Sequence, residues 1–277
     1  MRVGIVGLGL IGASIGLACK RRQAAKEILG HDIRRTNAKT ALERGAIDKS
    51  APLARIAECD LVFIAVPPQA VVSCLESLEA LRSDGLVATD CAGVKKKIAA
   101  WVAGRRSRRT WIVPGHPMAG TERQGPASAD ADMFSAKPWI FTPLEDTPEE
   151  VVQRLASAVR SLGARPVLMD ADAHDEQAAL LSHLPHFVAA ALVLSMKGKK
   201  LSFPAGTSWS GATRVAGSNP ELWSQISTIN RVEILEALDG FGRSIAEAKA
   251  VLRKKDPKAL RAYFASAARA KGSMRRR

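Results

Sequence analysis

The sequence predicts an α/β domain with a parallel sheet over residues 1–170, followed by an all-helical domain over residues 171–277. The chain opens on a short apolar strand that runs into a glycine-rich turn and then a helix. Apolar runs of strand length then alternate with helical segments as far as Met169, which is typical of a parallel sheet with crossover helices. Beyond Met169 the periodicity is helical, and no strand signal of any strength remains.

The composition favours a globular protein that binds small molecules. The 277 residues are 47% hydrophobic, which is enough to bury a sizeable core in one large or two ordinary domains. The formal net charge is +14, but the basic residues are spread out, without an aromatic-rich RNA-binding segment, zinc-ligand spacing or a long basic helix. We therefore expect an attraction for anionic small molecules and no nucleic-acid partner.

The cysteines and the N-terminus predict a cytoplasmic protein. Cys19, Cys59, Cys74 and Cys91 form no CxxC pair and fall on different predicted elements, which favours reduced thiols over a disulfide framework. The apolar run that ends at Cys19 contains five glycines, so a glycine-rich turn explains it better than a signal peptide or a lipoprotein signal. No other stretch is expected to span a bilayer, and we expect no membrane partner.

The first strand, Val3–Val6, leads into a GxGxxG motif that opens a helix continuing to Arg22. The cofactor-binding residues predicted from this motif are Gly7, Leu8, Gly9, Leu10, Ile11 and Gly12. The first glycine allows a tight turn, the second lets a pyrophosphate approach the backbone, and the third lets helix and strand pack closely. The N–H groups at the start of the helix would then bind phosphate. In this setting the motif predicts a Rossmann-type dinucleotide-binding domain.

The second strand ends in an acid that selects the cofactor. Residues 28–32 form this strand, and Asp32 lies twenty residues after Gly12. A carboxylate there would bind the ribose hydroxyls of the adenosine and repel a 2′-phosphate, which favours NAD. Arg34 and Arg35 follow closely and would soften that preference, so use of NADP stays open.

The alternation continues through the first half of the chain. Expected strands are residues 61–66, 86–90 and 111–113, and expected helices are residues 36–45 and 69–82. A further helix is expected to follow the loop of residues 90–95 and to end near Ala103. Because ligands bind beyond the carboxyl ends of parallel strands, we place Val66 and Pro67 with the cofactor. Residues 121–138 have the composition of an irregular excursion. A strand at 139–142 then rejoins a sheet, followed by a helix at 147–162 and a last strand at 165–169.

The segment after residues 111–113 is a loop in which His116 lies between two prolines and two glycines. Prolines fix φ and glycines permit unusual φ, so we expect a rigid, irregular backbone around this histidine. A histidine can accept a proton near physiological pH. A turn histidine without a chemical task is the alternative, but the loop lies at the sheet edge where a nicotinamide ring would bind. This placement predicts that His116 is catalytic.

The second half is expected to begin with one long, largely apolar helix over residues 172–196. Pro185 should kink it, and His183 and His186, three residues apart, would share a face. A metal site and two core histidines are alternatives to a substrate-facing site. Residues 187–194 are apolar on every side, which predicts burial against another subunit.

The remaining segments are expected to be helical, apart from one loop and the tail. Residues 197–218 are expected to form a polar loop, 219–240 a helix, 242–254 and 257–270 two more helices, and 274–277 a disordered tail. The loop contains Thr213 and Arg214.

Several motifs in this order resemble the prephenate/arogenate (cyclohexadienyl) dehydrogenase family of tyrosine biosynthesis. The shared motifs are the glycine motif, residues 115–122 (GHPMAGTE), His174-Asp175, residues 182–186 (SHLPH) and Thr213-Arg214. The resemblance covers nearly the whole chain and implies an N-terminal NAD(P)-binding domain and an all-α C-terminal dimerisation domain, hence a homodimer.

The resemblance also implies roles for individual residues, with His116 and His186 as the catalytic pair. His116 would accept the proton of the ring hydroxyl while hydride leaves for the nicotinamide, and loss of CO2 would give an aromatic product. His186 would help to hold the ring, and Arg214 would pair with a substrate carboxylate. Glu122 and Asp175 would orient His116 and the helix of residues 172–196 that carries His183 and His186, the histidine helix. The substrate-binding residues predicted are Arg214, His183, Thr213, Glu122 and Gly93.

Two positions depart from the family pattern. Members usually carry a serine in the loop after the fifth strand, whereas this chain has Gly93. The charged residues usual before Thr213-Arg214 are replaced by residues 208–212 (SWSGA), so the choice between prephenate and arogenate stays open. The alternative functions are another NAD(P)-dependent dehydrogenase, of the β-hydroxyacid or imine-reductase kind, and a non-catalytic dinucleotide sensor.

Overall fold

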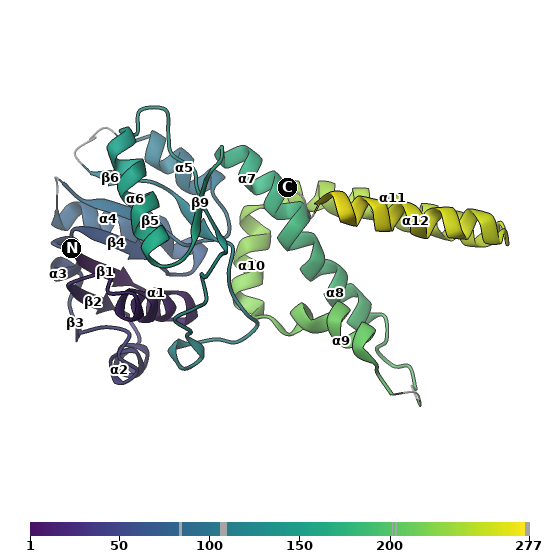
Figure 1. Ribbon diagram of the computed structural model, residues 1–277, viewed down its shortest axis with the longest axis horizontal. Coiled ribbons are helices and arrows are strands. Elements are labelled where there is room, and N and C mark those ends of the chain that lie inside the picture. The colour runs from purple at the N-terminus through teal and green to yellow at the C-terminus, as the bar shows by residue number, and fades with distance from the viewer. Residues whose placement is uncertain (83–84, 106–109, 201, 203, 275–277) are drawn as a thin grey trace. The chain divides into compact units, whose positions relative to one another are not determined.

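The computed structural model describes residues 1–82, 85–105, 110–200, 202 and 204–274 (Figure 1). The chain divides into two compact units, Met1–Arg231 and Val232–Arg277. The first unit holds all strands of the described residues. Residues 275–277, most of the tail expected to be disordered, lie outside the described part, and Met274 ends the last helix.

The first unit is built on a six-stranded parallel sheet in the order β3-β2-β1-β4-β5-β6. The strands are β1 (Arg2–Val6), β2 (Glu27–His31), β3 (Lys49–Ser50), β4 (Leu61–Ile64), β5 (Val87–Asp90) and β6 (Trp111–Ile112). All five strand pairs are parallel, and Val3 of β1 pairs with Ile28 on one side and Leu61 on the other. The strand order reverses between β1 and β4, which is the place where a doubly wound sheet binds its ligand. This confirms the predicted Rossmann-type fold.

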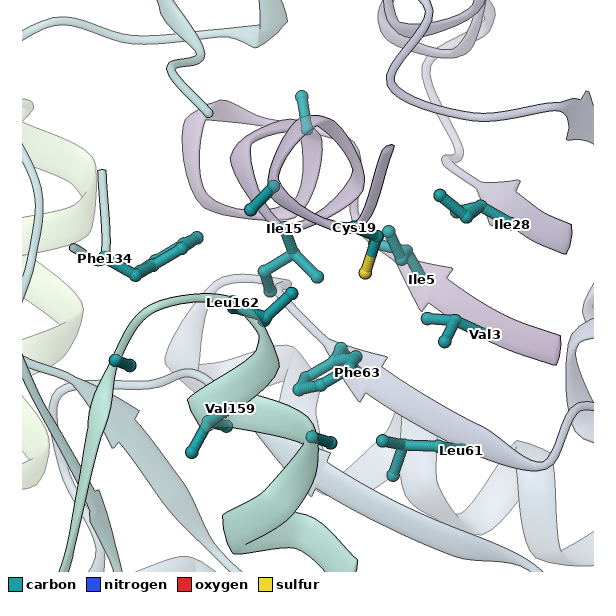
Figure 2. Close-up of a cluster of buried hydrophobic side chains, with 14 of the residues drawn as sticks. Val3, Ile5, Ile15, Cys19, Ile28, Leu61, Phe63, Phe134, Val159 and Leu162 are labelled. Carbon is teal, nitrogen blue, oxygen red and sulfur yellow. The ribbon is translucent and has the colours of Figure 1, made fainter. Parts of the chain in front are cut away.

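Helices cover both faces of this sheet. They are α1 (Leu10–Arg21), α2 (Arg35–Glu43), α3 (Leu53–Ala57), α4 (Val71–Leu81), α5 (Lys96–Ala103), α6 (Glu149–Ser161) and two 3-10 turns, η1 (Pro68–Ala70) and η2 (Pro126–Ser128). Figure 2 shows one face, where Ile15 of α1, Phe63 of β4 and Val159 of α6 pack in a single apolar cluster. Val62 and Ile64 face the other cluster, with residues of α3, α4 and α5. Residues of β4 therefore alternate between two buried faces, which explains their unbroken apolar run.

A second, three-stranded sheet corrects the expectation that His116 lies in a loop. Its strands, in the order β7-β8-β9, are β7 (Gly115–Pro117), β8 (Pro138–Phe141) and β9 (Arg165–Leu168). His116 is the middle residue of β7 and pairs antiparallel with Ile140. The strands expected at 139–142 and 165–169 thus join this separate sheet. A three-residue strand with a proline at one end is too short to show an alternating pattern, so the sequence does not reveal it.

The histidine helix is not a single α-helix kinked at Pro185. It consists of α7 (Ala171–Ala178), a π-helical segment η3 (Ala179–His183) and α8 (Leu184–Leu194). Pro185 lies in the first turn of α8, where its missing N–H would have no helical partner in any case. The irregularity is therefore the π segment before the proline, and such segments are frequent at functional sites.

The stretch Ala171–Leu194 is long and apolar enough to cross a bilayer by length and composition, whereas no such stretch is expected from the sequence. One such helix is weak evidence, since core and interface helices pass the same test. Within α8 only Ala189 is buried in the single chain, and Val193 and Leu194 are exposed, which leaves an apolar surface for the expected contact with another subunit.

The segment expected to be a polar loop contains helical turns. They are α9 (Thr207–Thr213) and the 3-10 turn η4 (Arg214–Gly217), and α10 (Pro220–Ile229) follows. Asn219 caps α10, because its side-chain oxygen accepts the N–H groups of Glu221 and Leu222. The serine, threonine and glycine content that predicts a loop is compatible with one short turn of helix.

Two helices complete the chain. They are α11 (Arg231–Arg253), which begins at the end of the first unit, and α12 (Pro257–Met274) in the second unit. The expected helix end near Gly240 is wrong: α10 ends at Ile229, and α11 continues through Gly240 and Gly242. A glycine inside a helix costs about 1 kcal/mol relative to alanine, which a 23-residue helix tolerates.

Candidate active site

The glycine turn after β1 has the shape that a bound pyrophosphate needs. Gly7 has φ of +88°, and a Cβ there would overlap the carbonyl oxygen of Ala65. A Cβ on Gly12 would overlap the carbonyl oxygen of Gly7, whereas the space beside Gly9 is open. The N-terminus of α1 has no side-chain cap and no acid in its first turn. A phosphate would therefore meet open backbone at a helix N-terminus.

Asp32, at the end of β2, is held beside this turn. Its carboxylate accepts the N–H of Leu8 at 2.7 Å, the N–H of Arg34 at 2.7 Å and the side-chain amide of Asn37 at 3.2 Å. The Leu8 contact comes from within the glycine motif, so the acid and the phosphate turn are fixed relative to each other. Arg34 and Arg35 are exposed. At the end of β4, Val66 and Pro67 complete the same edge, with Pro67 preceding η1.

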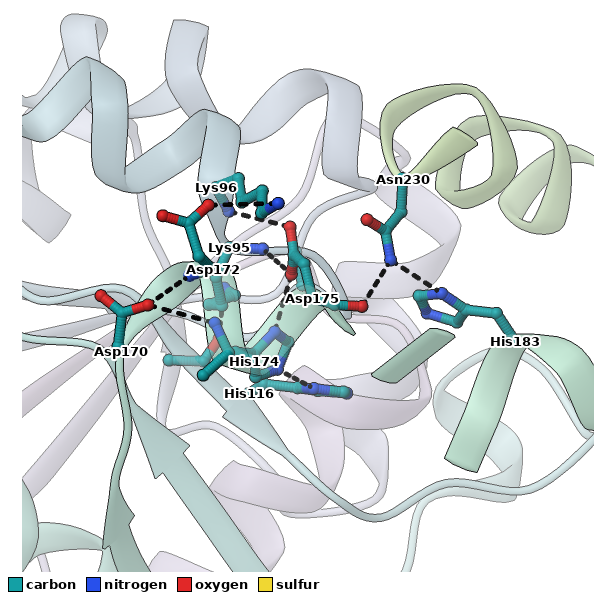
Figure 3. A network of polar contacts seen from close by, with 12 residues as sticks. Lys95, Lys96, His116, Asp170, Asp172, His174, Asp175, His183 and Asn230 are labelled. Carbon is teal, nitrogen blue, oxygen red and sulfur yellow. Dashed lines mark hydrogen bonds and ion pairs between the residues drawn. The ribbon is translucent and has the colours of Figure 1, made fainter. Parts of the chain in front are cut away.

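His116 in β7 hydrogen bonds to a second histidine that the sequence does not single out as a site residue. Its Nδ1 lies 2.9 Å from Nε2 of His174 in α7, and Nδ1 of His174 lies 2.7 Å from Oδ1 of Asp175 (Figure 3). His174 and Asp175 are each 1% exposed. The three side chains form a continuous hydrogen-bonded row that ends on a buried carboxylate.

Gly93 lies beside the other ring nitrogen of His116. A Cβ placed on Gly93 would be 3.6 Å from Nε2 and 3.7 Å from Cε1 of that ring. These are ordinary contact distances, so a side chain would fit there. Position 93 is thus where a serine hydroxyl would reach the histidine, and this chain leaves that place empty of side-chain atoms.

A buried ion pair fixes the strand that carries His116. Lys95 and Asp90 are both fully buried and form a salt bridge. Lys95 Nζ also donates to the carbonyl oxygen of Gly115 at 2.6 Å, and Asp90 Oδ1 accepts the N–H of Gly115 at 3.0 Å. The N–H and the carbonyl oxygen of Gly115, the residue before His116, are therefore both hydrogen bonded to buried side chains. The sequence places Asp90 at the end of an apolar strand, but it does not reveal that Lys95 is buried beside it.

Asp175 links the histidines to the loop of Gly93. Its two oxygens accept the N–H groups of Lys95 at 2.7 Å and Lys96 at 2.9 Å, at the start of α5. Its carbonyl oxygen accepts the side-chain amide of Asn230 at 2.9 Å, and that amide also lies 3.2 Å from Nδ1 of His183 (Figure 3). Residues from α5, α7, η3 and the end of α10 thus meet in one buried network.

His183 is 1% exposed and belongs to this network. It hydrogen bonds to the backbone of Gly93 as well as contacting Asn230. The ring is therefore engaged with groups of the protein itself. This geometry supports the Gly93 loop and differs from the substrate contact expected for His183.

Burial lowers the pKa of three histidines of this site, His116, His183 and His186. It lowers the pKa of His116 well below its usual value, and the nearby His174, Lys95 and His183 act in the same direction. Burial likewise lowers the pKa of His183 to about 4. The pKa of His186 is also lowered, mainly by burial. His116 at neutral pH therefore carries a lone pair that can accept a proton.

His186 lines a separate part of the site, a cavity of about 310 Å³. Its ring stacks on Trp223 with centroids 3.5 Å apart, and its Nδ1 lies 2.9 Å from the carbonyl oxygen of Ser182. The cavity is lined by His186, Phe187, Ala190, Val215, Ala216, Ser218, Pro220, Trp223, Ser224 and Ser227. A flat, mainly apolar ligand would fit against the histidine and the indole.

Arg214 and Glu122 form an exposed ion pair, with Nη1 and Oε2 3.1 Å apart. Hydrogen bonding and this arginine lower the pKa of Glu122. The neighbouring Thr213 hydroxyl donates to the carbonyl oxygen of Trp209 at 2.8 Å, within α9. The guanidinium of Arg214 thus already holds one carboxylate at the surface. Within the described residues, no group of three His, Cys, Asp or Glu side chains is arranged to hold a metal.

Family models match almost the whole chain. The model of the prephenate dehydrogenase nucleotide-binding domain matches residues 15–168, and that of the prephenate dehydrogenase dimerization domain matches residues 170–266. The prephenate dehydrogenase of Bacillus subtilis (strain 168) is 33% identical over 274 residues, which cover 95% of this chain and 73% of that protein.

Solved structures show the same architecture. Prephenate dehydrogenase from Aquifex aeolicus, in complex with hydroxyphenyl propionate and NAD+, superposes with a TM-score of 0.89 at 26% identity, over 99% of this chain and 98% of that one. Arogenate dehydrogenase from Synechocystis superposes with a TM-score of 0.81 at 29% identity, over 99% of this chain and 100% of the other.

Proposed function

Because the chain belongs to the prephenate dehydrogenase family, we propose that His116 is the base of that family's reaction and that the residues around it bind substrate and NAD. The protein is an oxidoreductase that catalyses the NAD-dependent oxidative decarboxylation of prephenate or arogenate. One observation carries the assignment of the base. Nε2 of His116, whose pKa is lowered by burial, lies beside Gly93 in the loop that follows the carboxyl end of β5.

The residues at the glycine turn fit NAD. The open backbone at Gly9 and the uncapped start of α1 would bind the pyrophosphate, and Asp32 would bind the ribose hydroxyls. Val66 and Pro67 would border the cofactor at the end of β4. When bound, the nicotinamide accepts a hydride from the substrate ring.

His116 would handle the proton of the ring hydroxyl. Its Nε2 accepts that proton as the ring carbon gives up its hydride, so the alcohol becomes a ketone. The carboxylate on the opposite ring carbon then leaves as CO2, and the electrons of the broken bond complete the aromatic ring. The ring oxygen, now a phenolate, takes the proton back from His116. Protons and electrons balance, because the alcohol is converted to a phenol without net proton release.

The cavity of His186 would hold the substrate ring and its side chain. His186 and Trp223 form one wall, and the ring would lie against this apolar surface. Arg214 would bind a substrate carboxylate in the way it now binds Glu122, with Thr213 shaping the turn behind it. Glu122 would then be displaced from the guanidinium as substrate binds. His183 and Gly93 would act indirectly, because the bond between them holds the loop of Gly93 in place next to His116.

The helical region would form the contact between two copies of the chain. Its family model is that of a dimerization domain, and the exposed apolar side chains Val193 and Leu194 of α8 would be covered in a homodimer. The two family models meet between residues 168 and 170, which supports a domain boundary at 170/171. We further propose a cytoplasmic enzyme without nucleic-acid or membrane partners, in which Ala171–Leu194 serves the site and the dimer.

The activity is tested by following NADH formation with prephenate and with arogenate, each with NAD and with NADP. Reduction of NAD with at least one substrate is expected, and the four rates give the substrate and cofactor preference. No reduction in any of the four mixtures, by a protein that binds NAD, would contradict the function and favour a dinucleotide sensor.

A further inference from the structure

The hydrogen bonds of His174 determine which nitrogen of His116 carries a proton. A carboxylate oxygen only accepts, so Nδ1 of His174 must donate to Asp175. The other nitrogen of a neutral His174, Nε2, then has a lone pair and accepts. Nδ1 of His116, 2.9 Å away, must therefore be the donor. In a neutral ring this leaves Nε2 of His116 without a proton.

We infer that His174 and Asp175 are positioning residues that fix His116 in the tautomer with a free Nε2, and that they do so in place of any side chain at Gly93. The catalytic consequence rests on the proposed function, whereas the tautomer itself does not. A histidine base in the wrong tautomer presents an N–H to the substrate hydroxyl and cannot take its proton.

The Asp175 carboxylate is rigidly held, which a positioning residue requires. Besides its bond to His174, it accepts the N–H groups of Lys95 and Lys96 at the start of α5, and its own backbone oxygen accepts the side-chain amide of Asn230. Asp175 and Asn230 are each 1% exposed. Water therefore does not compete for these bonds, and the direction of each is set by the fold.

The ring of His116 is hydrogen bonded at Nδ1 and not at Nε2 within the described residues. In the described part of the chain, His174 is the one residue with a hydrogen bond to that ring. At the Nε2 side, the nearest atom that a side chain on Gly93 would add is 3.6 Å away, and the chain has none. A hydroxyl there would bond Nε2 directly, so its absence transfers the control of the tautomer to the Nδ1 side.

The charged and titratable groups around the pair come from every element packed against it. They are Lys95, which precedes α5, Lys96 of α5, Asp90 of β5, Asp172 and Asp175 of α7, and His183 of η3. Lys95 is paired with Asp90 and Lys96 with Asp172. Asp175 is thus the carboxylate that bonds directly to His174.

The tautomer is measured directly by NMR of the full chain with ¹⁵N-labelled histidine, without substrate. Protonated and unprotonated ring nitrogens resonate in separate ranges, and the chain has only five histidines, so the spectrum is simple. The His116 signals are those that His116→Asn removes. We expect a protonated Nδ1 and an unprotonated Nε2. A His116 ring protonated at Nε2 in the wild-type chain would overturn the inference without any further variant.

Variants of His174 test the catalytic consequence. Phenylalanine fills the site without an acceptor, whereas glutamine keeps a side-chain oxygen that can accept the Nδ1 proton. We expect His174→Phe to lose the Nδ1 tautomer and to lower kcat by about 10²- to 10⁴-fold with little change in KM. His174→Gln should restore most of that loss. Equal effects of the two variants would contradict a positioning role through the hydrogen bond.

Gly93→Ala serves as the matched control, because a Cβ fits at ordinary contact distance and adds no hydrogen-bonding group. It should leave the tautomer of His116 unchanged, and the tautomer is the one quantity that this control compares. The His31 signals, from a ring bonded to the Ala51 carbonyl oxygen, should not move in any variant. The proposed function is tested by a different result. Full activity of His116→Asn would contradict His116 as the base, whichever tautomer the wild-type ring has.

Discussion

Nδ1 of His116 lies 2.9 Å from Nε2 of His174, although the two residues are 58 positions apart in the chain. One comes from a short strand and the other from the first turns of the histidine helix. Their contact joins the dinucleotide-binding part of the chain to the helical part at the reacting group. Folding of both parts therefore creates the base, and either part alone would leave His116 without its partner.

The activity should persist at acidic pH. The lowered pKa of His116 means that the ring stays unprotonated as the pH falls through 6.5, and kcat/KM should decline only below that value. The groups that face the ring are Lys95, His174 and His183, and burial is the largest cause. The measurement is the pH profile of kcat/KM. An acidic limb centred at or above 6.5 that shifts on substitution of His116 would contradict this prediction.

His183 should make the fold less stable in acid. Its pKa is about 4 in the folded chain and 6.5 when exposed, so between these values the unfolded chain binds the extra proton. The contribution of neutral His183 to the free energy of unfolding is complete above pH 6.5 and is lost as the pH falls to about 4. It amounts to about 3 kcal/mol, at roughly 1.4 kcal/mol per pKa unit. Urea unfolding of the wild type and of His183→Asn across this range measures it. His31→Asn is the control, and an equal pH slope in all three proteins would contradict the assignment.

Lys95→Met should destabilise the chain strongly, because it leaves the Asp90 carboxylate buried without its partner. Breaking such a pair typically costs about 3–5 kcal/mol. Adding Asp90→Asn should recover part of the loss, since an amide oxygen can still accept the N–H of Gly115. Lys96→Met is the matched control: its ion pair with Asp172 is partly exposed and should contribute less than about 1 kcal/mol. Equal losses in the two lysine variants, measured by urea unfolding, would be inconsistent with this role.

Asp32→Ser should improve the use of NADP relative to NAD. The carboxylate that repels a 2′-phosphate is removed, while a serine can still bond to the glycine turn, and Arg34 and Arg35 lie exposed nearby. The ratio of kcat/KM for the two cofactors measures the change. An unaltered ratio would mean that Asp32 does not select the cofactor.

The sheet and the cofactor edge were predictable because they depend on local patterns. The glycine motif fixes a tight turn whatever follows it, and the apolar run at Leu61–Ile64 requires burial on two faces. The order of strands then follows from the rules for parallel sheets, which place His116 and Gly93 at the same edge. The predicted residues therefore lie close to each other because the backbone path alone brings them there.

The hydrogen-bonding partners were not predictable in the same way. The role of His174 depends on a contact between distant segments, and the Asp90–Lys95 pair depends on burial that the sequence does not reveal. The long helix pattern of residues 172–196 gave no sign of a π segment at Ala179–His183. Likewise the burial of His183 follows from its bonds to Gly93 and Asn230 and differs from the exposed setting of a substrate ligand.

The most direct test of the account is the steady-state rate of NADH formation by His116→Asn, compared with the wild type at saturating NAD and substrate. Asparagine keeps a polar side chain of similar reach but cannot act as a base. We predict a loss in kcat of about 10²- to 10⁴-fold, with the dissociation constant for NAD unchanged. A variant that binds NAD normally and forms NADH at the wild-type rate would contradict the assignment of His116 as the base.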